Sequence, residues 1–141
     1  MIPPRRRDAD LGAVTIEFAL IALVLFTVLF GAVQYGYHYW ALSTASATAR
    51  ELAREVSVGN DVTACTTVAK SQASTAALGP VQVDVAYAPS RRLGATVTVT
   101  VSFRSLDTLP VPLPRDASGD VVVKETSSQV IHDLKPDPSA C

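Results

Sequence analysis

The sequence predicts an α+β protein in which a long N-terminal transmembrane helix is followed by a small head of one helix and roughly three antiparallel strands. This prediction depends on an early apolar stretch, on the absence of proline between Pro4 and Pro80, and on alternating valines further along. A chain of 141 residues is of single-domain size. We divide it into a basic leader (1–12), a transmembrane helix (13–34), an extension of the same helix outside the membrane (35–58) and an extracytoplasmic α+β head (59–141).

The leader is polar and basic, with Arg5, Arg6 and Arg7 in a row. Its two prolines, at positions 3 and 4, argue against helix within residues 1–10. The apolar run from Ala13 to Val33 has 21 residues and a single charge. As a helix it would reach ~31 Å, enough to cross the hydrocarbon core of a membrane. Because the next basic residue after the run is Arg50, the positive-inside bias predicts a cytoplasmic N-terminus and an external head.

Glu17 is the one charge in this run, and an unpaired carboxylate there costs a few kcal/mol, roughly 3 by insertion scales. One interpretation places Glu17 near the cytoplasmic interface, where it stays hydrated. In the other, its partner is an α-amino group made by cleavage after Gly12. The amine of Ala13 would lie four residues away on the same helix face, and a neighbouring subunit could supply an equivalent amine.

The stretch from Gly12 to Phe18 resembles the motif that prepilin peptidase recognises in type IV-like pilins, in which a basic leader ends in glycine and glutamate is the fifth mature residue. The wider stretch to about Val58 resembles the TadE-like proteins of tight-adherence (Flp) pilus systems. Its matching parts are the G-A-x-x-x-E-F-A-L motif from Gly12 to Leu20, an apolar run, a glycine- and aromatic-containing segment from Gly36 to Trp40, and an alanine- and arginine-rich helix.

The resemblance implies a pilin-like fold and a membrane-anchored minor subunit or assembly factor of a tight-adherence pilus. Gly12 and Ala13 would flank the cleaved bond, and Glu17, followed by Phe18, would pair with an amine during assembly. The implied partners are the lipid bilayer, prepilin peptidase, other pilin-like subunits and pilus assembly proteins. The implied location is the cell membrane, crossed once, and whether the protein also enters the filament stays open.

Two other interpretations fit the N-terminal segment. It could be an uncleaved anchor, which would make the protein a membrane-tethered binding module with an external head. It could also be a secretory signal peptide cut at Ala45-Ser46-Ala47, although about a dozen residues separate this site from the apolar run, more than such peptides usually have.

The helix is predicted to continue to about Val56, because only Gly31 and Gly36 interrupt its helix-forming residues. Four aromatic residues suit a belt at the membrane interface: Tyr35, Tyr37, Tyr39 and Trp40. A second set forms a small-residue ridge with a spacing of four: Ala41, Ala45, Ala49 and Ala53. Such a ridge lets another element approach closely, either the protein's own head or a neighbouring subunit.

The head begins at Gly59-Asn60-Asp61, which breaks the helix and can cap a second one from Val62 to Leu78, ended by Gly79-Pro80. Alternating apolar residues then predict an antiparallel hairpin, with valines on one face of residues 81–87 and of 97–103. Residues 105–120 contain three prolines and are expected to be an extended loop, and 121–131 a last strand.

Cys65 and Cys141 are too far apart in sequence for a redox or zinc motif. If the head is external, a disulfide between them is the leading interpretation, which would close a loop of about 75 residues and contribute ~3–4 kcal/mol. The alternative interpretation is two free thiols. The histidines, His38 and His132, lack the spacing of a metal motif, and no catalytic motif is present. We therefore expect no enzyme activity, no cofactor or metal, no small-molecule substrate and no binding to nucleic acid, for which the head has only scattered basic residues.

Overall fold

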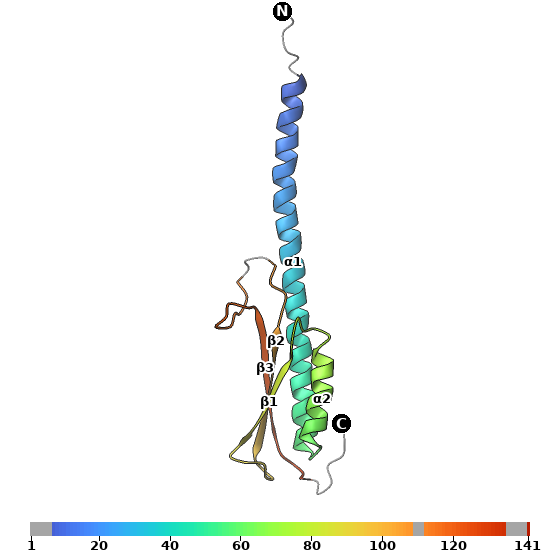
Figure 1. Ribbon diagram of the computed structural model, residues 1–141, viewed down its shortest axis with the longest axis vertical. Helices are drawn as coiled ribbons and strands as arrows, with labels where there is room; N and C mark the ends of the chain where they lie inside the picture. Colours follow the sequence, from blue (N-terminus) through green and yellow to red (C-terminus); the bar gives the residue numbers. More distant parts are fainter. Residues whose placement is uncertain (1–6, 109–111, 135–140) are drawn as a thin grey trace, which may run out of the picture.

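The computed structural model describes residues 7–108, 112–134 and 141, with side chains from residue 14 onward. One long helix carries a compact head along its C-terminal half, while its N-terminal half projects beyond the head (Figure 1). The elements in chain order are α1 (Arg7–Ser57), α2 (Val62–Ala73), β1 (Gln82–Ala88), β2 (Thr96–Arg104) and β3 (Val122–Val130). This arrangement confirms the predicted α+β class.

Helix α1 has 51 residues and is ~76 Å long. It runs without a break past Gly31 and Gly36, as the sequence predicts. The expectation that residues 1–10 are not helical is wrong for its last part, because α1 already begins at Arg7. A proline disfavours helix at its own position and at the residue before it, so Pro3 and Pro4 place no restriction on residues 7–10.

Helix α2 is capped as predicted: the Asp61 carboxylate accepts hydrogen bonds from the backbone N–H groups of Thr63 (3.3 Å) and Ala64 (3.2 Å). Its predicted end at Leu78 is wrong, since the helix stops at Ala73. The hydroxyls of Ser74 and Thr75 bond to backbone carbonyls three residues earlier and so compete with the helical ladder. The N–H of Leu78 donates instead to the Arg104 carbonyl of β2 (3.0 Å).

The sheet is antiparallel with the order β1-β2-β3, so β2 is central. Its register pairs Val83 with Val101 and Val101 with Glu125. The predicted alternation is confirmed most clearly on β2, where every second side chain is buried: Val97, Val99, Val101 and Phe103. The predicted hairpin and the third strand are also present, and a single bridge between Arg115 and Val121 precedes β3.

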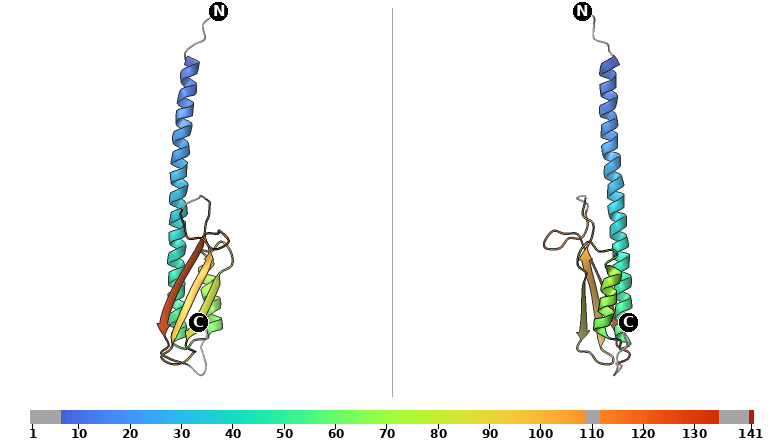
Figure 2. Two further views of the ribbon diagram at one scale, coloured as in Figure 1. Left: turned by 90° about the vertical axis from the view of Figure 1, so that its left-hand side faces the viewer. Right: turned by 45° about the vertical axis from the view of Figure 1, so that its right-hand side comes forward.

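Helices α1 and α2 cover one face of the sheet, and no helix or strand of the described residues covers the other face (Figure 2). The four alanines of the ridge on α1 are at most 1% exposed and belong to the same core as the β2 valines. Because alanine ends at Cβ, the sheet can lie close to the helix along this ridge. The lower half of α1 is therefore a wall of the head's core.

A larger side chain on the ridge should separate the helix from the sheet. We expect Ala49→Leu to lower the free energy of unfolding by about 1–3 kcal/mol, because Ala49 is 1% exposed and the core has no room for three more carbons. Denaturant unfolding of the full chain in detergent measures this change. The matched control is Ala47→Leu, at an exposed position of the same helix, and an equal loss in both variants would contradict the close packing.

Candidate membrane helix and its junction with the head

The projecting half of α1 has an apolar surface on all sides. An 18-residue window of this helix has a mean hydropathy of 2.6, and none of the window is buried. Phe18 is 72% exposed and Leu23 65%. By length and composition this segment can cross a membrane. An apolar surface of this extent is covered by lipid or by other proteins in a folded, functioning molecule.

The residues predicted to act in cleavage and assembly lie at the start of this surface. Gly12 and Ala13 are within α1, and Glu17 and Phe18 follow one turn later with exposed side chains. Residues four apart on a helix lie on one face, so Glu17 lies on the same face of α1 as Ala13, one turn further along the helix. The leader's first six residues lie outside the described part of the chain.

The aromatic residues at the end of the apolar segment divide into two kinds. Tyr39 is 75% exposed, and Tyr35 and Trp40 are each 46% exposed, as residues of an interfacial belt would be. Tyr37 instead turns toward the head, where its hydroxyl donates to the Ala76 carbonyl (3.1 Å). Its ring also meets that of Trp40 edge-on, with the centroids 5.6 Å apart.

Two buried polar side chains of α1 join the helix to the head at this level. Gln34 is fully buried, and its amide oxygen accepts a hydrogen bond from the Thr108 hydroxyl (2.9 Å). His38, one turn later, is 5% exposed and lies 3.4 Å from the Ser105 hydroxyl through Nδ1. These contacts hold the segment after β2 against the helix, just past the last residue of the apolar run.

Gln34 has no predicted role, and His38 enters the sequence-based predictions only as a histidine that lacks the spacing of a metal motif. A signal was present, because residues 34, 38, 41, 45 and 49 recur at intervals of three or four and so share one helix face. The buried face of α1 that carries the alanine ridge thus continues toward the apolar segment, where its buried residues are the polar His38 and Gln34. Helical spacing alone does not show which polar residues on such a face are buried.

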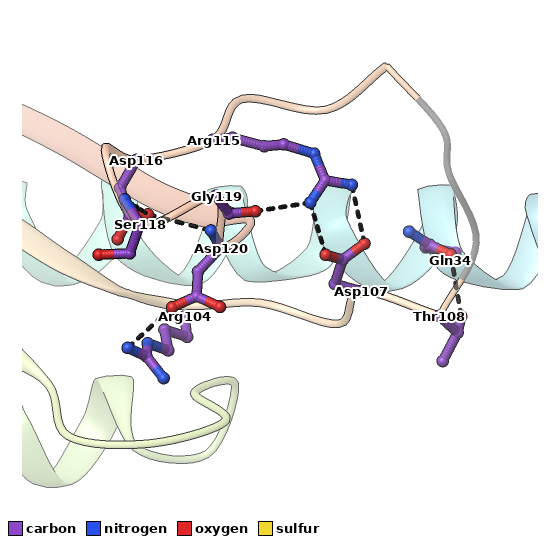
Figure 3. A network of polar contacts seen from close by, with 9 residues as sticks. All are labelled: Gln34, Arg104, Asp107, Thr108, Arg115, Asp116, Ser118, Gly119 and Asp120. Atoms are coloured by element: carbon purple, nitrogen blue, oxygen red, sulfur yellow. Dashed lines mark hydrogen bonds and ion pairs between the residues drawn. The ribbon is translucent and has the colours of Figure 1, made fainter.

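The loop between β2 and β3 carries a network of paired charges (Figure 3). The Arg115 guanidinium donates to both Asp107 oxygens (2.6 and 3.0 Å) and to the Gly119 carbonyl (2.7 Å). The hydrogen bond from Arg115 lowers the pKa of the Asp107 carboxyl. Arg104 forms an ion pair with Asp120 (2.8 Å). These contacts link the described residues of the loop, 105–108 and 112–120, to one another and to β2.

The two cysteines lie close together although they are 76 residues apart. The Cα atoms of Cys65, on α2, and of Cys141 are 5.1 Å apart, within the range of disulfides. Cys65 is 3% exposed. In residues 7–108 and 112–134 and at 141, no group of three or more His, Cys, Asp or Glu side chains is placed to hold a metal ion.

The fold and the exposed helix define a class of protein: a small α+β head built onto the lower half of a helix whose upper half can anchor it in a membrane. Residues 12–54 match the family model described as TadE-like protein, which confirms the resemblance predicted from the sequence. The match covers the apolar segment and the alanine ridge, and it leaves the rest of the head outside. No curated protein and no solved structure shows a significant match to the chain.

The buried His38 should make the head less stable in mild acid. Burial lowers the pKa of His38 from its ordinary value of 6.5, so the unfolded chain binds this proton more tightly than the folded chain. The stability it provides is complete well above pH 6.5 and is lost as the pH falls through 6.5 toward the lower pKa of the folded chain.

We expect the free energy of unfolding to decrease between about pH 7.5 and 5.5, and to depend less on pH in His38→Gln. Denaturant unfolding of the full chain at a series of pH values measures both slopes. His132→Gln is the control, since His132 is exposed and should leave the slope due to His38 in place. An unchanged slope in His38→Gln would contradict the assignment.

Proposed function

We propose that the protein is a non-enzymatic, pseudopilin-like membrane protein that acts in the assembly of a tight-adherence (Flp, type IV-like) pilus, as a minor subunit or an assembly factor. The observation that carries this proposal is the position of the TadE-like match. The matched residues lie in one continuous helix. Its N-terminal half has an exposed apolar surface, and its C-terminal half packs in the core of the head. Lateral helix contacts and an attached head are what a pilin-like subunit needs.

The protein enters the cell membrane once, with the leader in the cytoplasm and the head outside. The leader's arginines support this orientation, because they precede the apolar run and the next basic residue is Arg50. The cysteine pair supports it as well. Two cysteines at disulfide-bonding distance suit an oxidising compartment, and in the cytoplasm they would stay reduced.

Prepilin peptidase then removes the leader by cutting between Gly12 and Ala13. The cut produces an α-amine at the start of an apolar helix, four residues before Glu17. A free ammonium and a carboxylate inside the hydrocarbon are each costly, and pairing them removes much of the cost. If the amine pairs with Glu17 of the same chain, the pair stabilises a single subunit. If it pairs with the equivalent glutamate of a neighbouring chain, the pair favours insertion of the subunit next to that neighbour.

The partners on this proposal are the bilayer, the peptidase, and pilin-like subunits and assembly proteins that lie against the exposed helix. The exposed face from Val14 to Val33 has no covering element among the described residues. Lipid covers it before assembly, and partner helices replace the lipid afterwards. Phe18 adds a large apolar side chain, 72% exposed, beside the charged pair.

Glu17→Ala should separate assembly from folding. Because an unpaired amine in the membrane costs a few kcal/mol, incorporation into pilus assembly complexes should fall at least about tenfold. The head should stay folded, since Glu17 lies on the projecting half of α1. Cross-linking in cells that make the pilus system measures incorporation, and resistance of the head to protease measures folding.

The matched control is Glu51→Ala, which removes a carboxylate with a 54% exposed side chain from the head-bearing half of the same helix. It should assemble as the unmodified protein does. A Glu17→Ala protein that is incorporated normally would remove this role from Glu17.

A further inference from the structure

We propose that the loop between β2 and β3 is a second membrane contact, seated among the phospholipid headgroups beside the point where α1 leaves the bilayer. The contact surface consists of the described loop residues 105–108 and 112–120, here called the membrane-side loop. This inference rests on the proposed membrane span. It adds a surface of the head that contacts lipid. That contact would determine how far the head lies from the hydrocarbon core.

The position of the loop along α1 follows from its two contacts with the helix. Thr108 bonds to Gln34, the first residue after the apolar run, and Ser105 meets His38 four residues later. From Gln34 to His38 the helix rises ~6 Å, which is about the thickness of the headgroup layer on one side of a bilayer. A tilt of ~20° shortens this rise by less than a tenth. Both contacts therefore lie at headgroup depth when the apolar run spans the hydrocarbon.

All views place this loop at the end of the head that faces the projecting half of α1, whereas the turn between β1 and β2 is at the opposite end (Figures 1 and 2). The aromatic residues of α1 near these contacts also indicate that the loop lies at headgroup depth. Tyr35 lies within this stretch of helix and Tyr39 directly follows it; both side chains are exposed, and tyrosines favour the interface. The exposed tyrosines of the helix and the two contacts of the loop thus lie at about the same depth.

The chemistry of the membrane-side loop suits a layer of intermediate polarity. Each of its three carboxylates is satisfied by its own surroundings (Figure 3). Asp107 is paired with Arg115, and Asp120 with Arg104. Asp116 accepts hydrogen bonds from the backbone N–H groups of Ser118 (2.9 Å) and Asp120 (3.0 Å).

Paired charges lose less solvation energy than isolated ones when they move from water to a less polar layer. The remaining side chains include Leu106, Leu113 and the exposed prolines at 112 and 114, which can contact lipid without losing hydrogen bonds. The loop with Arg104 has no excess of positive charge, so attraction to anionic lipids is not what places it. The partner it fits is the zwitterionic headgroup layer itself.

The experiment uses the full chain in phosphatidylcholine vesicles, with a single tryptophan as a depth probe. The chain has one tryptophan, so Trp40→Phe gives a silent background. Pro112→Trp then reports on the loop, Leu23→Trp on the span, and Leu93→Trp on the far end of the head, where Leu93 is 61% exposed. Lipids brominated in the upper acyl chain quench a tryptophan that lies at or below the interface.

We expect the probe at position 112 to be quenched to about the same extent as the native Trp40, to be shielded from aqueous iodide, and to emit at shorter wavelength than the probe at 93. The probe at 93 should show no quenching by lipid. Leu113→Trp gives the same readout from the next residue if Pro112→Trp does not fold.

The outcomes separate this inference from the proposed membrane span. Quenching at 23 without quenching at 112 or 113 would keep the span and overturn the lipid contact, leaving the loop to face water or another protein. No quenching at 23 would overturn the membrane span and the inference together.

Discussion

The contact between the alanine ridge of α1 and the buried face of the sheet is the interaction on which the rest of the structure depends. Because these alanines are fully or almost fully buried, the sheet lies directly on the helix. The same helix continues without a break into the apolar segment. A head of about 85 residues therefore gains a core wall from the element that also serves as its anchor, which offsets the small core that such a domain builds alone.

This sharing couples the head to the membrane mechanically. A flexible linker would let the head adopt many orientations, but a helix that belongs to the core allows only one. Gln34 and His38 extend the coupling by binding Thr108 and Ser105 where the apolar run ends. When the helix rotates or moves along its axis, the head moves with it.

The sequence predicted those features that depend on periodicity. Alternating valines predicted β2 and its buried face. The lack of prolines and the break at Gly59-Asn60-Asp61 predicted one unbroken helix to about Val56, although not its start at Arg7. It did not predict features decided by tertiary contacts. Helix α2 stops at Ala73, where Ser74 and Thr75 compete for backbone carbonyls and Leu78 bonds to β2. The spacing of residues 34, 38 and 41 places Gln34 on the buried face of α1, but the residue that hydrogen-bonds to it, Thr108, is distant in sequence, and no local pattern identifies it.

The most direct test of a processed, pilin-like subunit is the intact mass and N-terminal residue of the chain, expressed with its peptidase and extracted from membranes without reductant. We predict a chain that begins at Ala13 and is lighter by two hydrogens, because a disulfide between Cys65 and Cys141, whose Cα atoms are 5.1 Å apart, would remove two thiol hydrogens. Gly12→Ala, made in the same cells, should keep its first twelve residues. An unmodified chain that still begins at Met1 would contradict the account and leave a simple membrane anchor with an external head.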